Sequence, residues 1–222
     1  MQRKITIPGE LSLTLGIVLT SIAVSFMVYA DLGISTISSL PYALSVIFDD
    51  VSFGAWNLVF QACLLVLLVG ITRHFKTGYI VSIVIATSFG LALDVFVDGM
   101  SFLPADEWCK VLYFIISYPI MCLAISLMVN SRIPLMVVDN FINDLTVHFH
   151  VTYRRMKTIF DIICLALSVI VPLVALGHLA GVGIGTVIMA LITGAGVQAA
   201  SKLLGRYIVI KPWSETLGRM AI

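Results

Sequence analysis

The sequence predicts an all-α membrane protein with six transmembrane helices, built as two inverted three-helix repeats. Each repeat also carries a short re-entrant or interfacial helix after its first span. Three observations lead to this prediction: the composition, the number of long apolar runs and the placement of the charged residues. Of the 222 residues, 60% are hydrophobic and 11% are charged, whereas a soluble domain is about half apolar and about a quarter charged. This composition excludes a soluble globular enzyme and predicts a lipid bilayer as the surrounding medium.

Six apolar runs are long enough to cross a bilayer, whose hydrocarbon core of about 30 Å requires roughly 20 helical residues. The predicted spans are residues 11–30, 53–71, 79–97, 111–129, 156–176 and 179–200. They leave no room for a water-soluble domain, so we expect residues 1–222 to form a single integral membrane domain. Its first repeat covers about 11–97, its second covers about 111–200, and residues 201–222 form a cytoplasmic tail.

The first span also resembles a signal peptide, because Arg3 and Lys4 precede it and Val28-Tyr29-Ala30 resembles a cleavage site. A usual signal peptide has an apolar core of roughly 7–15 residues, and this run is longer. We therefore interpret residues 11–30 as the first membrane span.

The charged residues predict an orientation. If each run crosses once, 12 of the 13 basic residues fall on the side of the N-terminus, and Lys110 alone falls on the opposite side. The loops on that opposite side instead carry acidic residues, namely Asp31, Asp49, Asp50, Asp98, Asp106 and Glu107. Basic residues collect on the cytoplasmic side of membrane proteins, so we expect both termini in the cytoplasm.

Two moderately apolar segments, 34–48 and 134–149, are too short to cross, and each follows the first span of one half. The two halves superpose with an offset of 101 residues and one deletion, which places Gln61 opposite Asp161. Because each half crosses three times, the second copy enters the membrane upside down. This architecture is common in secondary transporters, where paired short segments mark the substrate site.

The first short segment is rich in hydroxyl groups, which belong to Ser35, Thr36, Ser38 and Ser39. We place the following Pro41 in the first turn of a helix, where proline is tolerated. Ser38 or Ser39 is then the N-cap, and residues 33–36 form non-helical backbone. The hydroxyls and the helix N-terminus offer a site for a small anion, although helix capping explains the same residues equally well.

The second short segment has a polar face formed by Asp139, Asn140, Asn143 and Asp144. Carboxylate and amide oxygens are hard ligands, so these residues are candidates to line an aqueous vestibule that coordinates a cation or an amine. An amphipathic helix lying in the cytoplasmic interface has the same pattern. The sequence does not decide between these two interpretations.

Ionisable residues at membrane depth are costly and usually face a cavity or a partner. Asp161 lies one turn after Lys157 in the fifth span, and we take Asp161 and Gln61 as candidates for the substrate or ion pathway. The alternative for Asp161 is an ion pair with Lys157 near the cytoplasmic interface. We interpret Asp94 and Asp98, near the outer end of the third span, as a solvated helix end.

Thr186 in the last span is a further pathway candidate, and it lies among several glycines. Polar residues within spans more often form hydrogen bonds between helices, and small residues let helices approach closely.

The sequence predicts no metal ion, no cofactor and no enzymatic activity. Its four cysteines stand singly, without the spacing of a zinc site or a disulfide framework. It contains no Gly-rich phosphate loop, HExxH motif or nucleophile elbow. The net charge of +1 also gives no basic surface for nucleic acid.

Two glycine-based motifs support a resemblance to a known family. Leu32-Gly33-Ile34-Ser35-Thr36 follows the first span, with Pro41 close behind, and the last span holds Gly183-Ile184-Gly185-Thr186-Val187-Ile188 and Gly194. This pattern resembles the YczE/YitT-type small bacterial membrane proteins. The resemblance implies a five- or six-helix protein of the bacterial inner membrane, with no established substrate. Ser39-Leu40-Pro41-Tyr42-Ala43 lacks the carboxylate of the Pro-Trp-Asp that we expect in YczE-like members.

These observations predict a secondary transporter or carrier of a small solute. The two short segments would form gates near the midplane, an ion or proton gradient would supply the energy, and Asp161 would be the coupling group. The alternative is a membrane-embedded binding or accessory subunit that works with a partner protein. The expected partners are the lipid bilayer, a small solute, and a second copy of the chain or a partner subunit.

Overall fold

The computed structural model describes residues 5–104, 106–131, 133 and 136–211. Six long helices match the predicted spans: α1 (Gly9–Ala30), α3 (Phe53–Thr72), α4 (Gly78–Gly99), α5 (Glu107–Asn130), α7 (Tyr153–Leu176) and α8 (Ile184–Tyr207). Two helices of 12 residues, α2 (Thr36–Ile47) and α6 (Val137–His148), occupy the two predicted short segments. The six long helices are all long and apolar enough to cross a membrane. The predicted class, an all-α membrane protein with six spans, is confirmed.

The last span differs from its prediction at both ends, because α8 covers Ile184–Tyr207 rather than 179–200. Gly177 ends α7 in a left-handed conformation with φ of 75°, and Gly181 has φ of 73°. Glycine adopts these angles without steric cost, so the apolar residues between them belong to a connection that hydropathy alone does not distinguish from a helix. Residues 201–207 of the predicted tail are helical, and residues 212–222 lie outside the described residues.

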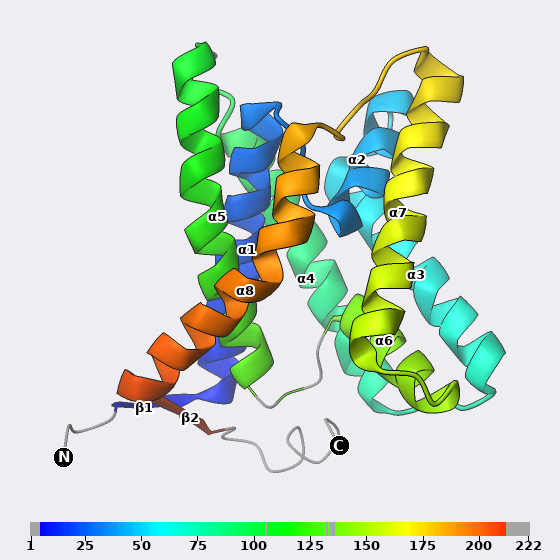
Figure 1. The fold of residues 1–222 in the computed structure, drawn as a ribbon, viewed down its shortest axis with the longest axis vertical. Coiled ribbons are helices and arrows are strands. Elements are labelled where there is room, and N and C mark those ends of the chain that lie inside the picture. Colours follow the sequence, from blue (N-terminus) through cyan, green and yellow to red (C-terminus); the bar gives the residue numbers. More distant parts are fainter. Residues whose placement is uncertain (1–4, 105, 132, 134–135, 212–222) are drawn as a thin grey trace.

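Two strands join the ends of the described chain. β1 (Ile5–Pro8) pairs in parallel with β2 (Ile208–Lys211), with Ile5 opposite Ile208. Because α1 follows β1 directly and β2 follows α8 directly, the pair ties the first span to the last. The connections α3–α4 and α6–α7 lie at the same end of the bundle as these strands (Figure 1).

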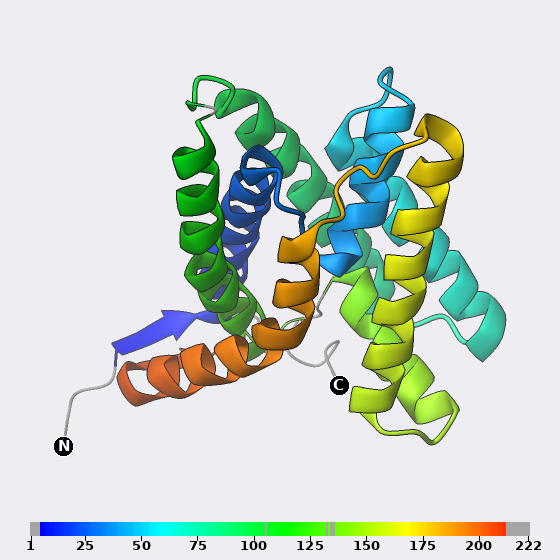
Figure 2. The same ribbon diagram turned by 45° about the horizontal axis from the view of Figure 1, so that its top comes forward.

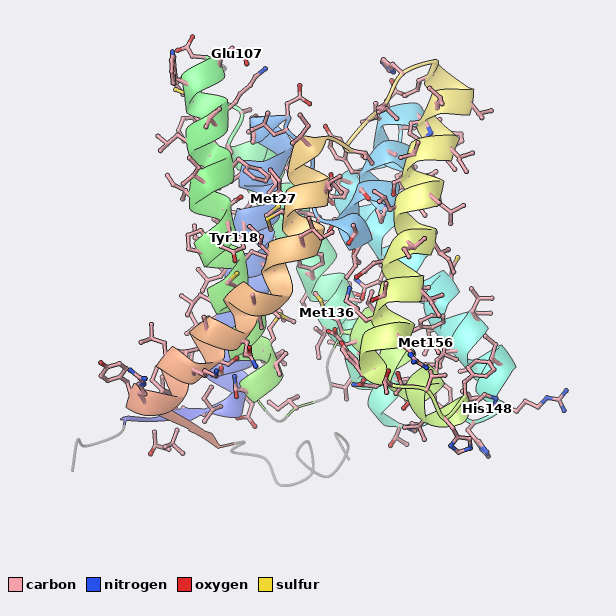
Figure 3. The ribbon with its side chains drawn as sticks, viewed as in Figure 1. Met27, Glu107, Tyr118, Met136, His148 and Met156 are labelled. Atoms are coloured by element: carbon pink, nitrogen blue, oxygen red, sulfur yellow. The ribbon has the colours of Figure 1, made fainter. Side chains whose placement is uncertain are left out.

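Both short helices begin near the middle of the bundle and run toward opposite ends (Figures 1 and 2). α2 runs toward the end that carries the α7–α8 connection, and α6 runs toward the end that carries the strands. In Figure 3, Met136 precedes α6 at about mid-height, whereas His148, the last residue of α6, lies at the lower end. The N-termini of the two short helices therefore face the interior of the bundle from opposite sides.

The most extensive helix contact joins α1 to α5. Gly16 of α1 lies directly against Met128 and the carbonyl oxygen of Ala124. The buried Ser12 Oγ donates a hydrogen bond to the carbonyl oxygen of Leu127 at 2.8 Å. Small residues and interhelical hydrogen bonds stabilise helix pairs in membranes, so this pair forms the centre of the fold.

α8 is the least covered of the six long helices. α4 packs against both α1 and α3, whereas α8 packs against α5 and, in the described residues, hardly contacts α7. Only 6% of the apolar window of α8 is buried, compared with 22–56% for the other five spans. Figure 1 shows α8 diverging from α7 toward the end that carries the strands.

We expect Gly90→Ala to weaken the packing of α3 on α4. An added Cβ at Gly90 would lie 2.7 Å from the carbonyl oxygen of Gly54, so the two backbones must separate, at a cost of about 1–3 kcal/mol in the free energy of unfolding. The measurement is the midpoint of chemical unfolding in mixed micelles. Gly70→Ala on α3 is the control because nothing lies within 4 Å of its added Cβ, whereas Gly90 lies on α4. An equal effect of the two changes would contradict the close α3–α4 contact.

Candidate functional site

Ser35, and not Ser38 or Ser39, occupies the N-cap position of α2, without a side-chain capping hydrogen bond, so the predicted cap was wrong. The amides of Ser38 and Ser39 donate to the Ser35 carbonyl oxygen at 3.0 and 2.9 Å, and the helix begins at Thr36. Pro41 consequently lies inside the helix and not in its first turn. Proline has no N–H, so the carbonyl of Ile37, one turn before Pro41, lacks its usual hydrogen-bond donor. The Ser35 hydroxyl donates to Ser38 Oγ at 3.1 Å.

Ser39 fastens α2 to α7. Its Oγ lies 2.7 Å from Ser168 Oγ and also donates to the carbonyl oxygen of Thr36 at 2.9 Å. Both serines are fully buried, and Thr36 is 8% exposed. The hydroxyl of Ser39 is therefore engaged in packing between helices, whereas Ser35 is only half-buried beside the α2 N-terminus.

Asn140 and Asp144, one turn apart on α6, fasten this helix to the beginning of α4. Asn140 Nδ2 donates to Ser82 Oγ at 2.7 Å. Asp144 accepts a hydrogen bond from the hydroxyl of Tyr79 and forms an ion pair with Lys76 at 2.6 Å. The structure thus separates the four polar residues predicted to line a vestibule: these two anchor α6, Asn143 is exposed, and Asp139 is half-buried and interacts electrostatically with Lys157 of α7.

Lys157 and Asp161 form an ion pair on α7, with 2.5 Å between Lys157 Nζ and Asp161 Oδ1. Their side chains are 31% and 26% exposed. Asp139, in the first turn of α6, interacts electrostatically with Lys157, so one ammonium group lies near two carboxylates. The ion pair between Lys157 and Asp161, which was the alternative interpretation of Asp161, is present. Asp139 extends it to a group of three charged residues.

Gln61 and Asn57 form a similar pair on α3. Gln61 Nε2 donates to Asn57 Oδ1 at 2.8 Å, and both residues are 2% exposed. Gln61 Oε1 is buried and has no hydrogen-bond partner among the described residues. The pair occupies the position in the first half that Lys157 and Asp161 occupy in the second, and it is neutral where theirs is charged.

We expect stability to depend on the protonation of Asp139. α6 does not span the bundle, and burial raises the pKa of the Asp139 carboxyl from 3.8 to about 6, against the opposing charge of Lys157. Because the folded protein then binds this proton more tightly than the unfolded chain does, stability falls as the pH rises through the window between these two values. Asp139→Asn should therefore melt at a higher temperature than the unchanged protein at pH above about 7, and at the same temperature at pH below about 4.

Asp98→Asn is the control for this experiment, because Asp98 is exposed at the end of α4. The same pH dependence in the unchanged protein and in the Asp139→Asn variant would contradict the assignment of this proton to Asp139.

Thr186 stabilises the beginning of α8. It is fully buried, and its Oγ1 accepts a hydrogen bond from the amide of Gly183 at 3.3 Å. The neighbouring amide of Gly185 donates to the carbonyl oxygen of Leu32 at 2.7 Å, and the amide of Ile34 donates to Gly181 at 3.1 Å. Thr186 therefore lies where the α1–α2 and α7–α8 connections cross.

Asp94 has a role that the sequence did not predict. It accepts hydrogen bonds from Ser52 Oγ at 2.7 Å and from the amide of Gly54 at 2.6 Å. Ser52 Oγ in turn accepts from the amide of Ala55 and caps α3. The interpretation of Asp94 as a solvated helix end was therefore wrong. Ser52 lies directly before the predicted second span, and a serine in this position is a typical helix cap, so the sequence contained one of the two partners of Asp94.

A cavity of about 150 Å³ lies at the end of the bundle opposite the strands. The last turn of α1, the α1–α2 connection, Tyr42 of α2 and the α7–α8 connection line it. It includes one carboxylate, Asp31, and the surface that it presents is mainly polar. The cavity was not predictable from the sequence. Part of its wall is the α7–α8 connection, and these residues were assigned to the last span, 179–200.

The described residues include no group of three or more His, Cys, Asp or Glu side chains that could hold a metal ion. The four cysteines are free thiols, and Cys122 and Cys164 are buried.

Comparison with known proteins identifies the family of the chain. A family model described as a family of unknown function, DUF6198, matches residues 7–202. No curated protein and no solved structure matches the chain. The match begins just before α1 and ends in the last turns of α8. It covers most of the chain, which therefore belongs to this family of unknown function, DUF6198.

Proposed function

We propose that the chain is a secondary transporter or carrier of a small solute in the bacterial inner membrane, with both termini in the cytoplasm. One observation supports this function above the others: α2 and α6 enter the bundle from opposite ends and begin near its middle (Figure 1). Half-helices with interior N-termini leave polar backbone at membrane depth, and such backbone is tolerated only inside protein or beside a water-filled path. The basic segments at the end that carries the strands favour the cytoplasmic placement of that end.

The packing of the helices supports an inverted repeat. Both halves have the order long, short, long, long. α2 of the first half packs on α7 of the second, and α6 of the second half packs on α3 of the first. The contact of α1 with α4 likewise corresponds to that of α5 with α8. A twofold operation that exchanges the halves would produce this pattern, in which each short helix is held by the opposite half.

The charged group on α6 and α7 is our candidate for ion coupling. Lys157 lies near both Asp139 and Asp161, so uptake of a proton by either carboxylate changes the balance of attraction on the lysine. A proton gradient would drive transport through this group, and Asp161 remains the first candidate because it forms the ion pair.

Cysteine accessibility in oriented vesicles tests the proposed pathway. In a variant without the four native cysteines, a single cysteine replaces Ser35 or Met136, which precede α2 and α6. We expect a membrane-impermeant thiol reagent to label the Ser35→Cys variant from the outer side and the Met136→Cys variant from the cytoplasmic side. Val66→Cys is the control, because Val66 is 73% exposed on a span and faces lipid in the proposed topology. If neither the Ser35→Cys variant nor the Met136→Cys variant reacts, the aqueous pathway is contradicted.

A second function is an accessory subunit that presents a surface to a partner protein, and the sparse burial of α8 favours it. Purification in mild detergent separates the two functions. A transporter is expected to elute alone or as a homo-oligomer, whereas an accessory subunit is expected to bring a distinct protein in stoichiometric amount.

Kinship with the YczE/YitT-type proteins is part of this proposal. Its support is the sequence motif before Pro41 and the glycines near the beginning of α8. In the structure these two regions meet, since Gly185 and Leu32 are joined by a backbone hydrogen bond.

A further inference from the structure

We propose that the cavity at the end opposite the strands binds a small organic cation of the ammonium or guanidinium class, held by Asp31 and Tyr42. This inference names the substrate class of the proposed carrier and so rests on that function. Four features of the cavity lead to it: its fixed walls, its negative charge, its aromatic side and its volume.

Backbone hydrogen bonds hold the walls of the cavity. The amide of Ile34 donates to the carbonyl oxygen of Gly181 at 3.1 Å, and the amide of Gly185 donates to that of Leu32 at 2.7 Å. These bonds join two connections that are about 150 residues apart in sequence, one before α2 and one before α8. Ligand sites are usually formed before the ligand binds, and a cavity between two mutually bonded loops meets this requirement.

The electrostatic environment of the cavity favours a cation. Asp31 is the C-cap of α1, in a left-handed conformation with φ of 52°, and its amide donates to the carbonyl oxygen of Val28. The C-terminus of a helix carries partial negative charge from its free carbonyl groups. The carboxylate and the end of the 22-residue α1 therefore add to each other. The beginnings of α2 at Thr36 and α8 at Ile184 lie just after the lining residues and carry partial positive charge, but the full charge of the carboxylate together with the end of α1 leaves the cavity net negative.

Tyr42 forms the aromatic side. The rings of Tyr42 and Phe53 form a T-shaped contact with 5.3 Å between their centroids. Tyr42 also leaves no room for a side chain at Gly181, where an added Cβ would lie 2.5 Å from Tyr42 Cδ1. Burial and the charge of Asp31 raise the pKa of the Tyr42 hydroxyl, so the phenol stays neutral beside the carboxylate. A neutral aromatic ring attracts ammonium and guanidinium ions through its face.

The volume and the ligand set favour an organic ion over a metal ion. A cavity of about 150 Å³ matches one that holds benzene, a molecule of roughly six non-hydrogen atoms. A calcium ion requires about six to eight oxygen ligands, and the lining contains the single carboxylate of Asp31. The surface of the cavity is mainly polar, which suits the N–H donors of an ammonium or guanidinium ion.

Titration of the purified protein with guanidinium and methylammonium chloride at millimolar concentration tests the site, with urea as the uncharged counterpart of guanidinium. We expect saturable binding of at least one of the two cations by calorimetry, and none of urea. Asp31→Asn should weaken this affinity at least about tenfold, because a charge-assisted contact is lost. Asparagine tolerates the left-handed conformation, so this variant is expected to fold.

Two further variants complete the test. Asp98→Asn removes another exposed acid at the end of α4, outside the cavity lining, and should leave the affinity unchanged. Tyr42→Leu should weaken binding several-fold, whereas Tyr42→Phe, which keeps the ring, should not. This pair tests the site independently if Asp31→Asn does not fold.

The outcomes separate the binding site from the function. Absence of saturable cation binding, or equal loss in the Asp31→Asn and Asp98→Asn variants, overturns the site. Cation binding in detergent without cation uptake in proteoliposomes supports the site and counts against the carrier. Uptake of another solute without cation binding supports the carrier and overturns the site.

Discussion

Asp161→Asn is expected to reduce proton-driven uptake in proteoliposomes to less than about one tenth of the unchanged rate, because it removes the charge that Lys157 contacts at 2.5 Å. The proposed probe is radiolabelled guanidinium, which stays charged and does not cross lipid as a neutral base. The melting temperature should change by no more than about 3 °C, since a partly exposed ion pair contributes roughly 0–1 kcal/mol. The loss is therefore one of coupling rather than of folding.

The control for this variant is Gln61→Asn, which shortens the neutral side chain at the matching position of the first half and adds no charge. It should retain most of the uptake rate. Unchanged uptake by the Asp161→Asn variant under a proton gradient would show that Asp161 is not the coupling group, and Asp139→Asn would then be the next variant to measure.

Asp144→Ala is expected to lower the free energy of unfolding by about 2 kcal/mol, because it leaves the hydroxyl of a buried tyrosine without its acceptor. Tyr79 is 2% exposed, and its hydroxyl donates to the Asp144 carboxylate. The change also releases one of the two anchors that hold α6 on α4. The measurement is the unfolding midpoint in mixed micelles.

Lys76→Ala removes the other partner of Asp144 and is the matched control. The Lys76 side chain is 58% exposed, so its ion pair is screened by water and contributes roughly 0–0.5 kcal/mol. If Lys76→Ala were as costly as Asp144→Ala, the ion pair rather than the tyrosine contact would hold α6.

The spans could be predicted from sequence because each crossing requires about 20 apolar residues regardless of what the helix contacts. The short helices were also predictable, since 34–48 and 134–149 are apolar but too short to cross. The beginning of α8 was not predictable from hydropathy. The positive φ of Gly177 and Gly181 interrupts the helix, and this backbone effect leaves no trace in the count of apolar residues.

The candidate site was predictable in its residue types but not in its contacts. The repeat alignment placed Gln61 opposite Asp161, and in the structure each forms a pair with the residue four positions before it. In contrast, Ser39 was a candidate ligand and instead bonds Ser168, 129 positions away in sequence. A serine in an apolar span has no periodic partner in the sequence, so bonds between distant helices become visible only once the fold is known.

The parallel pairing of β1 with β2 gives α8 a second point of attachment. At its beginning, α8 is joined to the α1–α2 connection through Gly185 and Leu32, and at its end it continues into a strand bonded to the strand before α1. A helix fixed at both ends cannot swing outward as a free arm, even though its middle lies against α5 and away from α7. Any displacement of α8 must therefore be a rotation or a bowing about the line between its two attachments, and both attachments move with α1.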